Sequence, residues 1–241
     1  MSVVFPEADF RAFYTAAVKH FPGPVSDECL WDPNERRQQF DRAWQAVRYR
    51  HRLCVECSEE FSRALATGSA AWHAGLRDEE VDYTLERCIY VFFTSSLSLF
   101  ESFGFCLYFL GNAAQPSAFP HIVDPRKITL EKTRKAFVKV FPQEGATQEL
   151  VQLSQRPEYG EIDEVRNILG HRLLGTRSIH SIGMTQSDGT HTEDRQETWY
   201  IPGCSRKLSL NDSMLFDRLK NLTDLFTRLA LAARSFAEAL P

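Results

Sequence analysis

The chain has 241 residues, a formal net charge of −4 and 43% hydrophobic residues. This length fits one large domain or two small ones, and the apolar fraction is enough to build a core, which excludes an intrinsically disordered protein. The mildly acidic charge also excludes a protein that binds nucleic acid through its whole surface, so any contact with RNA or DNA requires a local basic patch.

The N-terminal segment and the cysteines both bear on the cellular compartment. The first residues, MSVVFPEADFRAF, have no basic start followed by an apolar stretch, so we do not expect a signal peptide. The six cysteines are scattered along the chain: Cys29, Cys54, Cys57, Cys88, Cys106 and Cys204. We therefore expect reduced, mostly buried thiols and a cytoplasmic protein.

The first two predicted elements are helices. The first covers Glu7 to His20 and is ended by the residues FPGP. The second begins near Pro33 and Asn34, which are helix-start signals, and is ended by ATGSA at residues 66–70. Its apolar positions keep helical spacing over many turns: Phe40, Trp44, Val47, Cys54, Phe61 and Leu65.

A possible metal site on this second helix competes with a simpler explanation. His51, Cys54 and Cys57 lie at three-residue steps. A structural zinc site needs four ligands, usually with a second pair elsewhere, and the chain has no second Cys-x-x-Cys. Core packing of these side chains is therefore favoured over zinc, and we expect no metal and no cofactor.

The same helix is basic, with arginines at Arg36, Arg37, Arg42, Arg48, Arg50 and Arg52. Such a run is typical of a solvated helix face whose side-chain stems cover apolar surface. It could instead line a path for RNA, with Trp44 or Tyr49 as a stacking surface. We favour the solvated face.

A third helix is predicted from near Asp78 to Leu110, with Gly111 and Asn112 as its stop. Its stretch Ile89 to Leu110 is long enough to span a bilayer. Because it carries Glu101 and several hydroxyl side chains, and no Lys/Arg cluster flanks it, we expect a buried central helix and no membrane span. Glu101 should then find a partner on a facing helix, or could orient a catalytic group; the structural role is favoured.

The remaining predicted elements are a loop at 115–125, helices at 128–141, 147–153 and 160–175, a β-hairpin insertion at 176–202, and a last helix from Asn211 to Ala239. The sequence therefore predicts an all-α fold: one domain, residues 1–241, built as an antiparallel bundle of long helices with the hairpin before the C-terminal helix. The role of the hairpin is not predicted.

The residues DEVRNILGHR, 163–172, form the most unusual pattern in the chain. On a helix, Asp163, Asn167 and His171 lie four residues apart and share one polar face. Arg166 precedes His171 by five residues, about 140° around the helix. In the simplest explanation, Arg166 pairs with Asp163 and His171 is an ordinary surface histidine.

These residue types also suit cleavage of RNA by its own 2′-hydroxyl. That reaction needs a base with a pKa near neutral for the hydroxyl proton and a fixed positive charge for the crowded phosphate. His171 supplies the first and Arg166 the second. Asn167 could orient the histidine ring or hold a phosphate oxygen, and the chemistry requires no metal.

The segment RNILGHR resembles the catalytic motif of the HEPN superfamily of small all-helical proteins, in which an arginine and a polar residue precede a histidine. Many members are metal-independent endoribonucleases in toxin, antiphage and RNA-processing systems. The resemblance covers roughly 37–174 and implies catalysis by Arg166, Asn167 and His171, with Asp163, Glu101 and Arg172 in support. It implies a homodimer whose paired motif helices form a composite site, RNA as the substrate, and an antitoxin protein as a partner. The alternative is a catalytically inactive HEPN-like scaffold that binds RNA, nucleotides or proteins.

Overall fold

The structure is a computed structural model, and it describes residues 5–21, 33–73, 78–122, 124–170, 176–185, 191–200, 207–211 and 213–240. Within these ranges the α-helices are α1 Glu7–Ala17, α2 Pro33–His73, α3 Glu79–Ala114, α4 Leu130–Val140, α5 Gly145–Leu153, α6 Pro157–Gly170 and α7 Met214–Ala239. Short 3-10 turns cover Val18–His20, Pro116–Ala118 and Pro125–Lys127. The strands are β1 Thr176–Thr185, β2 His191–Tyr200 and β3 Lys207–Leu210.

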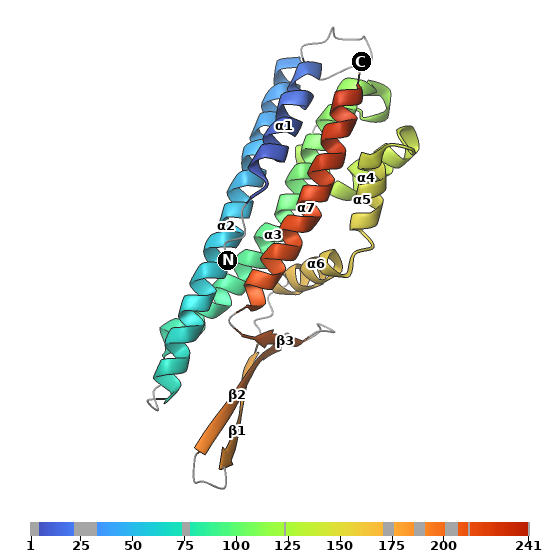
Figure 1. Cartoon of the computed structure of the whole chain (residues 1–241). Coiled ribbons are helices and arrows are strands. Elements are labelled where there is room, and N and C mark those ends of the chain that lie inside the picture. The colour runs from blue at the N-terminus through green and yellow to red at the C-terminus, as the bar shows by residue number, and fades with distance from the viewer. Residues whose placement is uncertain are drawn as a thin grey trace.

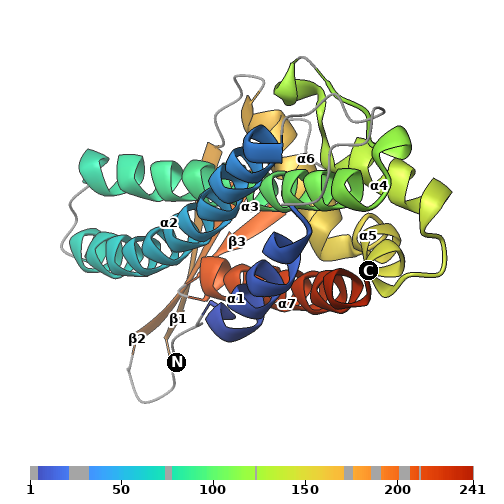
Figure 2. The ribbon, with the colours of Figure 1, turned by 90° about the horizontal axis from the view of Figure 1, so that it is seen from above.

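The long helices form an elongated bundle (Figure 1). Helices α2 and α3 are an antiparallel pair that packs along much of its length, and α1 and α7 pack side by side against it (Figure 2). The shorter helices α4 and α5 lie along one side, where α4 contacts α3 and α5 contacts α7. Helix α6 contacts both α3 and α7 near the end of the bundle where α7 begins. The prediction of a mostly helical chain is confirmed.

Helix α3 lies at the centre of this arrangement because its sequence is apolar on nearly every side. It contacts α2, α4, α6 and α7. By length and composition it could cross a membrane, but 67% of its most apolar window is buried inside the fold. Such burial is what the core helix of a soluble protein shows, and it confirms the prediction that residues 89–110 form a buried central helix.

Aromatic side chains fill the core between α1, α2, α3 and α7. The Phe226 ring of α7 contacts Phe10 of α1 and Phe103 of α3, with ring centroids 5.2 Å apart in both cases. The indole of Trp44 stacks on Phe10 at a centroid separation of 3.4 Å. These contacts join four helices that are distant in sequence, and each aromatic ring buried there removes a large apolar area from water.

The ends of the two central helices differ in part from the prediction. Helix α3 begins as expected, because the Asp78 carboxylate accepts hydrogen bonds from the backbone N–H groups of Glu80 and Val81. It does not stop at Gly111 and Asn112 but continues to Ala114. Asn112 is buried, and its amide donates to the backbone carbonyl of Phe119 at 2.6 Å, so tertiary packing satisfies a side chain that often ends helices.

Helix α2 likewise continues through residues 66–70 to His73. Glycine and serine in this segment lower helix propensity only by about 1 kcal/mol or less per residue. The partner helix α3 begins beside this end of α2 (Figure 1), and pairing with it continues the two-helix packing.

The segment between α6 and α7 contains the three strands. β1 pairs with β2 antiparallel, with Thr176 opposite Tyr200 and Thr185 opposite His191, and β2 pairs with β3. The β1–β2 ribbon extends beyond the end of the bundle (Figure 1). Its base is joined to the helical core through the buried side chains of Trp199, Leu208 and Leu210. The predicted insertion, 176–202, falls on this segment, but residues 186–190 and 201–202 lie outside the described residues.

Two glycines on different helices provide a test of the close packing between α3 and α4. A Cβ atom at Gly104 would lie 2.7 Å from the Leu130 Cδ1 atom and 3.0 Å from its Cα, whereas a Cβ at Gly160 would meet nothing within 4 Å. We expect Gly104→Ala to lower the free energy of unfolding by about 1–3 kcal/mol, because α4 must move away from α3. Gly160→Ala should leave it unchanged or raise it by up to about 1 kcal/mol. Urea unfolding followed by circular dichroism measures both; equal stabilities would contradict the tight contact.

Candidate active site

Helix α6 buries one face and exposes the other. Ile162, Val165 and Leu169 repeat every three or four residues and are all buried. The Tyr159 ring packs edge-on against Phe100 of α3, with centroids 5.4 Å apart. This packing fixes the rotation of α6 about its own axis, and Arg166 consequently lies on the exposed side.

Three of the predicted site residues form one connected chain of hydrogen bonds on this exposed side. The Arg166 Nη1 group donates to Asn167 Oδ1 at 2.9 Å, and Asn167 Nδ2 donates to Asp163 Oδ1 at 3.0 Å. Arg166 makes no ion pair with Asp163 or with any other residue that the structure describes. The Asp163–Arg166 pair in the simplest explanation of the motif is therefore wrong, because Asp163 accepts from Asn167 and Asn167 accepts from Arg166. The other part of that explanation, an ordinary surface histidine at 171, lies outside the described residues.

The two other motif residues, His171 and Arg172, lie outside the described residues. Helix α6 ends at Gly170, directly before His171, and a Cβ atom at Gly170 would meet nothing within 4 Å.

Glu101 is hydrogen-bonded to α4 and not to Arg166. Its Oε2 atom accepts a hydrogen bond from the backbone N–H of Leu130 at 2.8 Å, and so caps the first turn of α4. Burial lowers the pKa of the Arg50 guanidinium, and the negative charge of Glu101 offsets part of that lowering. Glu101 makes no hydrogen bond with Arg166, so its observed role is to hold α4 against α3.

The histidine and cysteines of α2 pack in the core. The His51 Nε2 atom lies 3.0 Å from the Thr223 hydroxyl of α7, and the His51 side chain is 2% exposed. The Cys54 thiol donates to the backbone carbonyl of Phe92, and burial raises its pKa to about 12. Among the residues that the structure describes, no three His, Cys, Asp or Glu side chains are grouped as metal ligands. Core packing therefore explains these residues.

A groove that sequence reasoning did not find lies between α2, α3 and the turn before α4. It has a volume of about 410 Å³. Arginines enter it from two elements, Arg42 and Arg50 from α2 and Arg126 from the 3-10 turn, and Glu101 lies on its wall. The sequence signal was the basic run on α2, but the sequence could not show that Arg126 and Glu101, far away in the chain, face the same groove.

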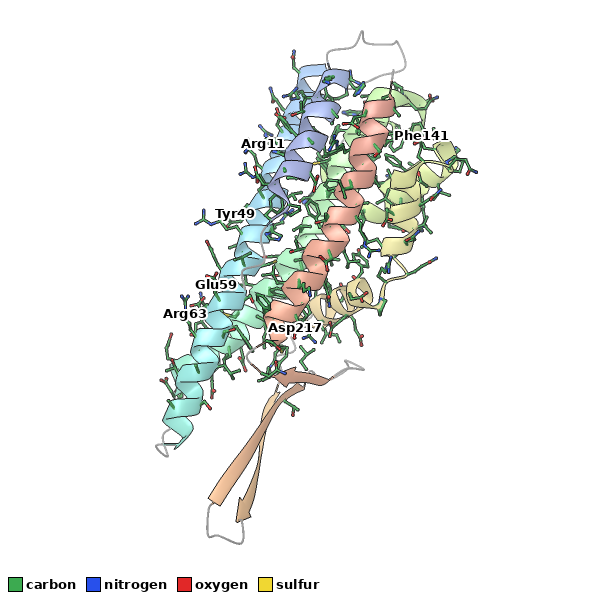
Figure 3. All side chains as sticks on the ribbon, in the orientation of Figure 1. Arg11, Tyr49, Glu59, Arg63, Phe141 and Asp217 are labelled. Carbon is green, nitrogen blue, oxygen red and sulfur yellow. The ribbon has the colours of Figure 1, made fainter. Side chains whose placement is uncertain are left out.

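The two aromatic residues proposed as stacking surfaces differ in exposure. Trp44 is buried against Phe10 and is not accessible to a nucleic acid base, so the less favoured alternative, an RNA path along α2, is wrong for this residue. Tyr49 is 63% exposed on the outer face of α2 (Figure 3). A base can reach only the second of these rings.

Comparison with known proteins found no match to a protein-family model, to a curated protein or to a solved structure. Function therefore has to be argued from the site itself.

Burial of His51 predicts that acid destabilises the fold. Desolvation lowers its pKa from 6.5 to about 4, so between these values the unfolded chain takes up a proton that the folded chain does not. The contribution of His51 is fully present above pH 6.5 and is lost as the pH falls toward 4, by roughly 3 kcal/mol in all.

Urea unfolding across this pH range measures the effect in the wild type and in two variants. His51→Gln should flatten the fall in the free energy of unfolding, because glutamine can still bond Thr223 but does not titrate. His20→Gln is the control, at a histidine whose ring lies 2.8 Å from the Ala237 carbonyl. It should keep the part of the acid-induced fall in the free energy of unfolding that His51 causes. An unchanged slope in His51→Gln would show that another group causes the loss.

Proposed function

We propose that the chain is a cytoplasmic, HEPN-like, metal-independent endoribonuclease that cleaves RNA by internal transesterification. In this proposal His171 is the catalytic base, or the acid for the leaving oxygen, and Arg166 stabilises the phosphate. The protein acts as a homodimer, and an antitoxin protein is its regulatory partner. The hairpin insertion at 176–202 belongs to this HEPN-like fold as an addition before the last helix.

The observation that carries the proposal is the state of Arg166. Its guanidinium is exposed, has no carboxylate partner among the described residues, and is braced by Asn167 at 2.9 Å. A salt bridge would already have used its charge and its paired donors. With only one donor engaged, the guanidinium retains further N–H groups that match two oxygens of a phosphodiester.

The Asp163–Asn167 bond gives the neighbouring residues a supporting role. Asn167 uses its oxygen to hold Arg166 and one amide hydrogen to bond Asp163, so the guanidinium is positioned before a substrate arrives. Such preorganisation lowers the cost of orienting a charged group in the transition state. We therefore assign Asn167 and Asp163 as positioning residues, with Arg166 touching the phosphate.

The reaction follows from these groups. The base takes the proton of the ribose 2′-hydroxyl, the 2′-oxygen attacks phosphorus, and the bond from phosphorus to the 5′-oxygen breaks. The leaving 5′-oxygen receives a proton, and the other fragment keeps a 2′,3′-cyclic phosphate. Negative charge builds on the non-bridging oxygens as the fifth bond forms, which is where the Arg166 guanidinium acts.

A second copy of α6 completes the site in this proposal. On a continued helix, Arg166 would lie about 140° from His171, so one helix does not present both on one face. In a twofold-symmetric dimer, Arg166 of one protomer can face His171 of its partner, because every residue at the interface occurs twice. Exposure of Arg166 in the single chain is consistent with a site that closes only on pairing.

The first prediction concerns cleavage of a single-stranded RNA in EDTA. We expect wild-type protein to produce 2′,3′-cyclic phosphate ends, detected by mass spectrometry, and an RNA with a 2′-deoxy residue at the cut site to be inert. Removing the base in His171→Ala should lower the rate about 10²–10⁴-fold. Removing the charge in Arg166→Ala should lower it about 10²–10³-fold.

Arg156→Ala is the matched control, because Arg156 precedes the same helix and is outside the motif. It should retain wild-type cleavage. If His171→Ala, Arg166→Ala, Arg156→Ala and the wild type all cut equally, the cleavage comes from a contaminant. The chain is then better explained as a non-catalytic scaffold than as a nuclease.

The second prediction separates a composite site from a site within one protomer. Arg166→Ala and His171→Ala proteins, each inactive alone, are mixed under conditions that exchange subunits. Half of the dimers should then be mixed, and each mixed dimer has one site with both native groups, so about a quarter of wild-type activity should return. Activity that stays at the level of the separate variants would place Arg166 and His171 in the same protomer's site.

A further inference from the structure

The arginines of the first half of α2 separate into two groups when their partners are compared. Four of the six are engaged elsewhere: Arg37 pairs with Asp41, Arg48 with Glu7 and Arg52 with Glu56, and Arg36 is buried and donates to Asn112. The remaining two are Arg42 and Arg50, and neither makes an ion pair with any residue that the structure describes. Both line the groove between α2, α3 and the turn before α4.

The groove holds its arginines in different ways. The Arg50 Nη1 group donates to the backbone carbonyl of Ser98 at 2.8 Å, which fixes the side chain along the α2–α3 seam. Arg126, on the opposite rim, forms an ion pair with Asp124, in which its Nε and Nη2 groups donate over 2.9 and 3.2 Å, and its Nη1 group has no hydrogen-bond partner among the described residues. Arg42 has no hydrogen-bond partner among the described residues and is exposed, so its full set of donors faces solvent.

The groove combines three guanidinium groups and the Glu101 carboxylate with an apolar floor. Ala43, Ala46, Phe105 and Ile128 line it together with the arginines. From Gln39 to Arg50 it follows twelve residues of α2, whose first and last Cα atoms are about 16 Å apart along the helix axis. A site of this length and chemistry suits a chain-like ligand that carries repeated anionic groups and flat apolar surfaces between them.

An exposed aromatic ring projects from α2 outside the lining of the groove. Tyr49 is seven residues from Arg42, so the two project from the same face of α2. Tyr49 is 63% exposed, and Figure 3 shows it pointing away from the bundle. Arginines that reach phosphates beside an exposed aromatic ring form the arrangement with which proteins hold single strands.

We propose that this groove binds the phosphate backbone of single-stranded RNA, with Arg42 and Arg126 on opposite rims and Tyr49 stacking on a base. It is a binding surface on α2, α3 and the 124–129 turn, separate in its residues from the motif on α6. The choice of RNA as the ligand rests on the proposed function, but binding in the groove does not require that the chain cleave RNA.

A 2′-O-methyl oligouridine with a fluorescent label tests the groove without the chemistry. This RNA lacks the attacking hydroxyl, so its binding is independent of any cleavage. Fluorescence anisotropy of the full-length chain, in EDTA and over a range of salt concentrations, gives the affinity and its salt dependence.

We expect Arg42→Glu and Arg126→Gln each to weaken binding at least about five-fold near 0.1 M salt. Each lost phosphate contact should also reduce the slope of log K against log salt by about 0.7. Tyr49→Ala should weaken binding at least about five-fold through lost stacking, with its salt slope unchanged. Tyr49→Phe, which keeps the ring, should bind like the wild type.

Arg63→Glu is the matched charge control, because Arg63 is exposed on the same helix, away from the groove (Figure 3). It should leave affinity nearly unchanged. Equal weakening by Arg42→Glu and Arg63→Glu would mean a diffuse charge effect and overturn the groove, as would a wild-type chain that does not bind the oligonucleotide. Circular dichroism melting of each variant identifies any loss that comes from misfolding.

Free uridine monophosphate, added as a competitor, distinguishes a strand from a single nucleotide. At matched nucleotide concentration it should not displace the oligouridine, because one phosphate cannot reach Arg42 and Arg126 together with Tyr49. Complete displacement would assign the groove to a free nucleotide and overturn the strand. The proposed nuclease is judged by a different readout, which is RNA cleavage. Loss of cleavage in His171→Ala with oligouridine binding intact would support both proposals. Binding by the wild type without any cleavage would support the groove and contradict the nuclease.

Discussion

The structure depends on keeping helix α3 out of water. Its apolar surface surrounds the helix instead of forming one stripe, so a single neighbour cannot cover it. Helices α2, α4, α6 and α7 all contact it. The positions of the shorter helices α4 and α6 are therefore set by the need to cover α3, and not by their own modest apolar faces. The exposed polar side chains of α4 and α6 therefore lie on the sides of these helices that face away from α3.

Both candidate functional surfaces arise where helices that cover α3 meet solvent. On α6, the ring contact between Tyr159 and Phe100 fixes which side of the helix is buried, and Arg166 is left on the other. Next to Phe100 in the chain, Glu101 caps α4 and lies on the wall of the groove. One buried helix thus supports two polar sites that share no side chains.

The sequence predicted the parts of the fold that follow from periodicity. The buried helix at 89–110 and its start near Asp78 were both visible in local patterns, because each depends on residues close in the chain. The continuation of α3 past Gly111 could not be predicted in this way. It depends on the Phe119 carbonyl, which reaches Asn112 only after the chain has turned back.

In the candidate site, too, the features that depend on local spacing were predictable and those that depend on distant residues were not. Spacing on a helix predicted that Asp163 and Asn167 share a face, and the structure has them bonded. The same spacing favoured an Asp163–Arg166 pair, which is absent because the amide of Asn167 competes for the carboxylate. The groove is lined by residues that range from 39 to 129 in the sequence. Trp44 lies within the same basic run of α2 as Tyr49, but Phe10 of α1 buries it. Long-range packing decides such features, and a single sequence does not display it.

The contact between Gly104 and Leu130 also sets the shape of the groove. The absence of a side chain at Gly104 lets the start of α4 sit directly on α3, where the backbone of Leu130 follows the groove residues Ile128 and Thr129. The distance between the two rims of the groove therefore depends on the small size of the glycine side chain at position 104. A larger residue at position 104 would push the start of α4 away from α3 and so widen the groove, although none of the residues that line it would have changed.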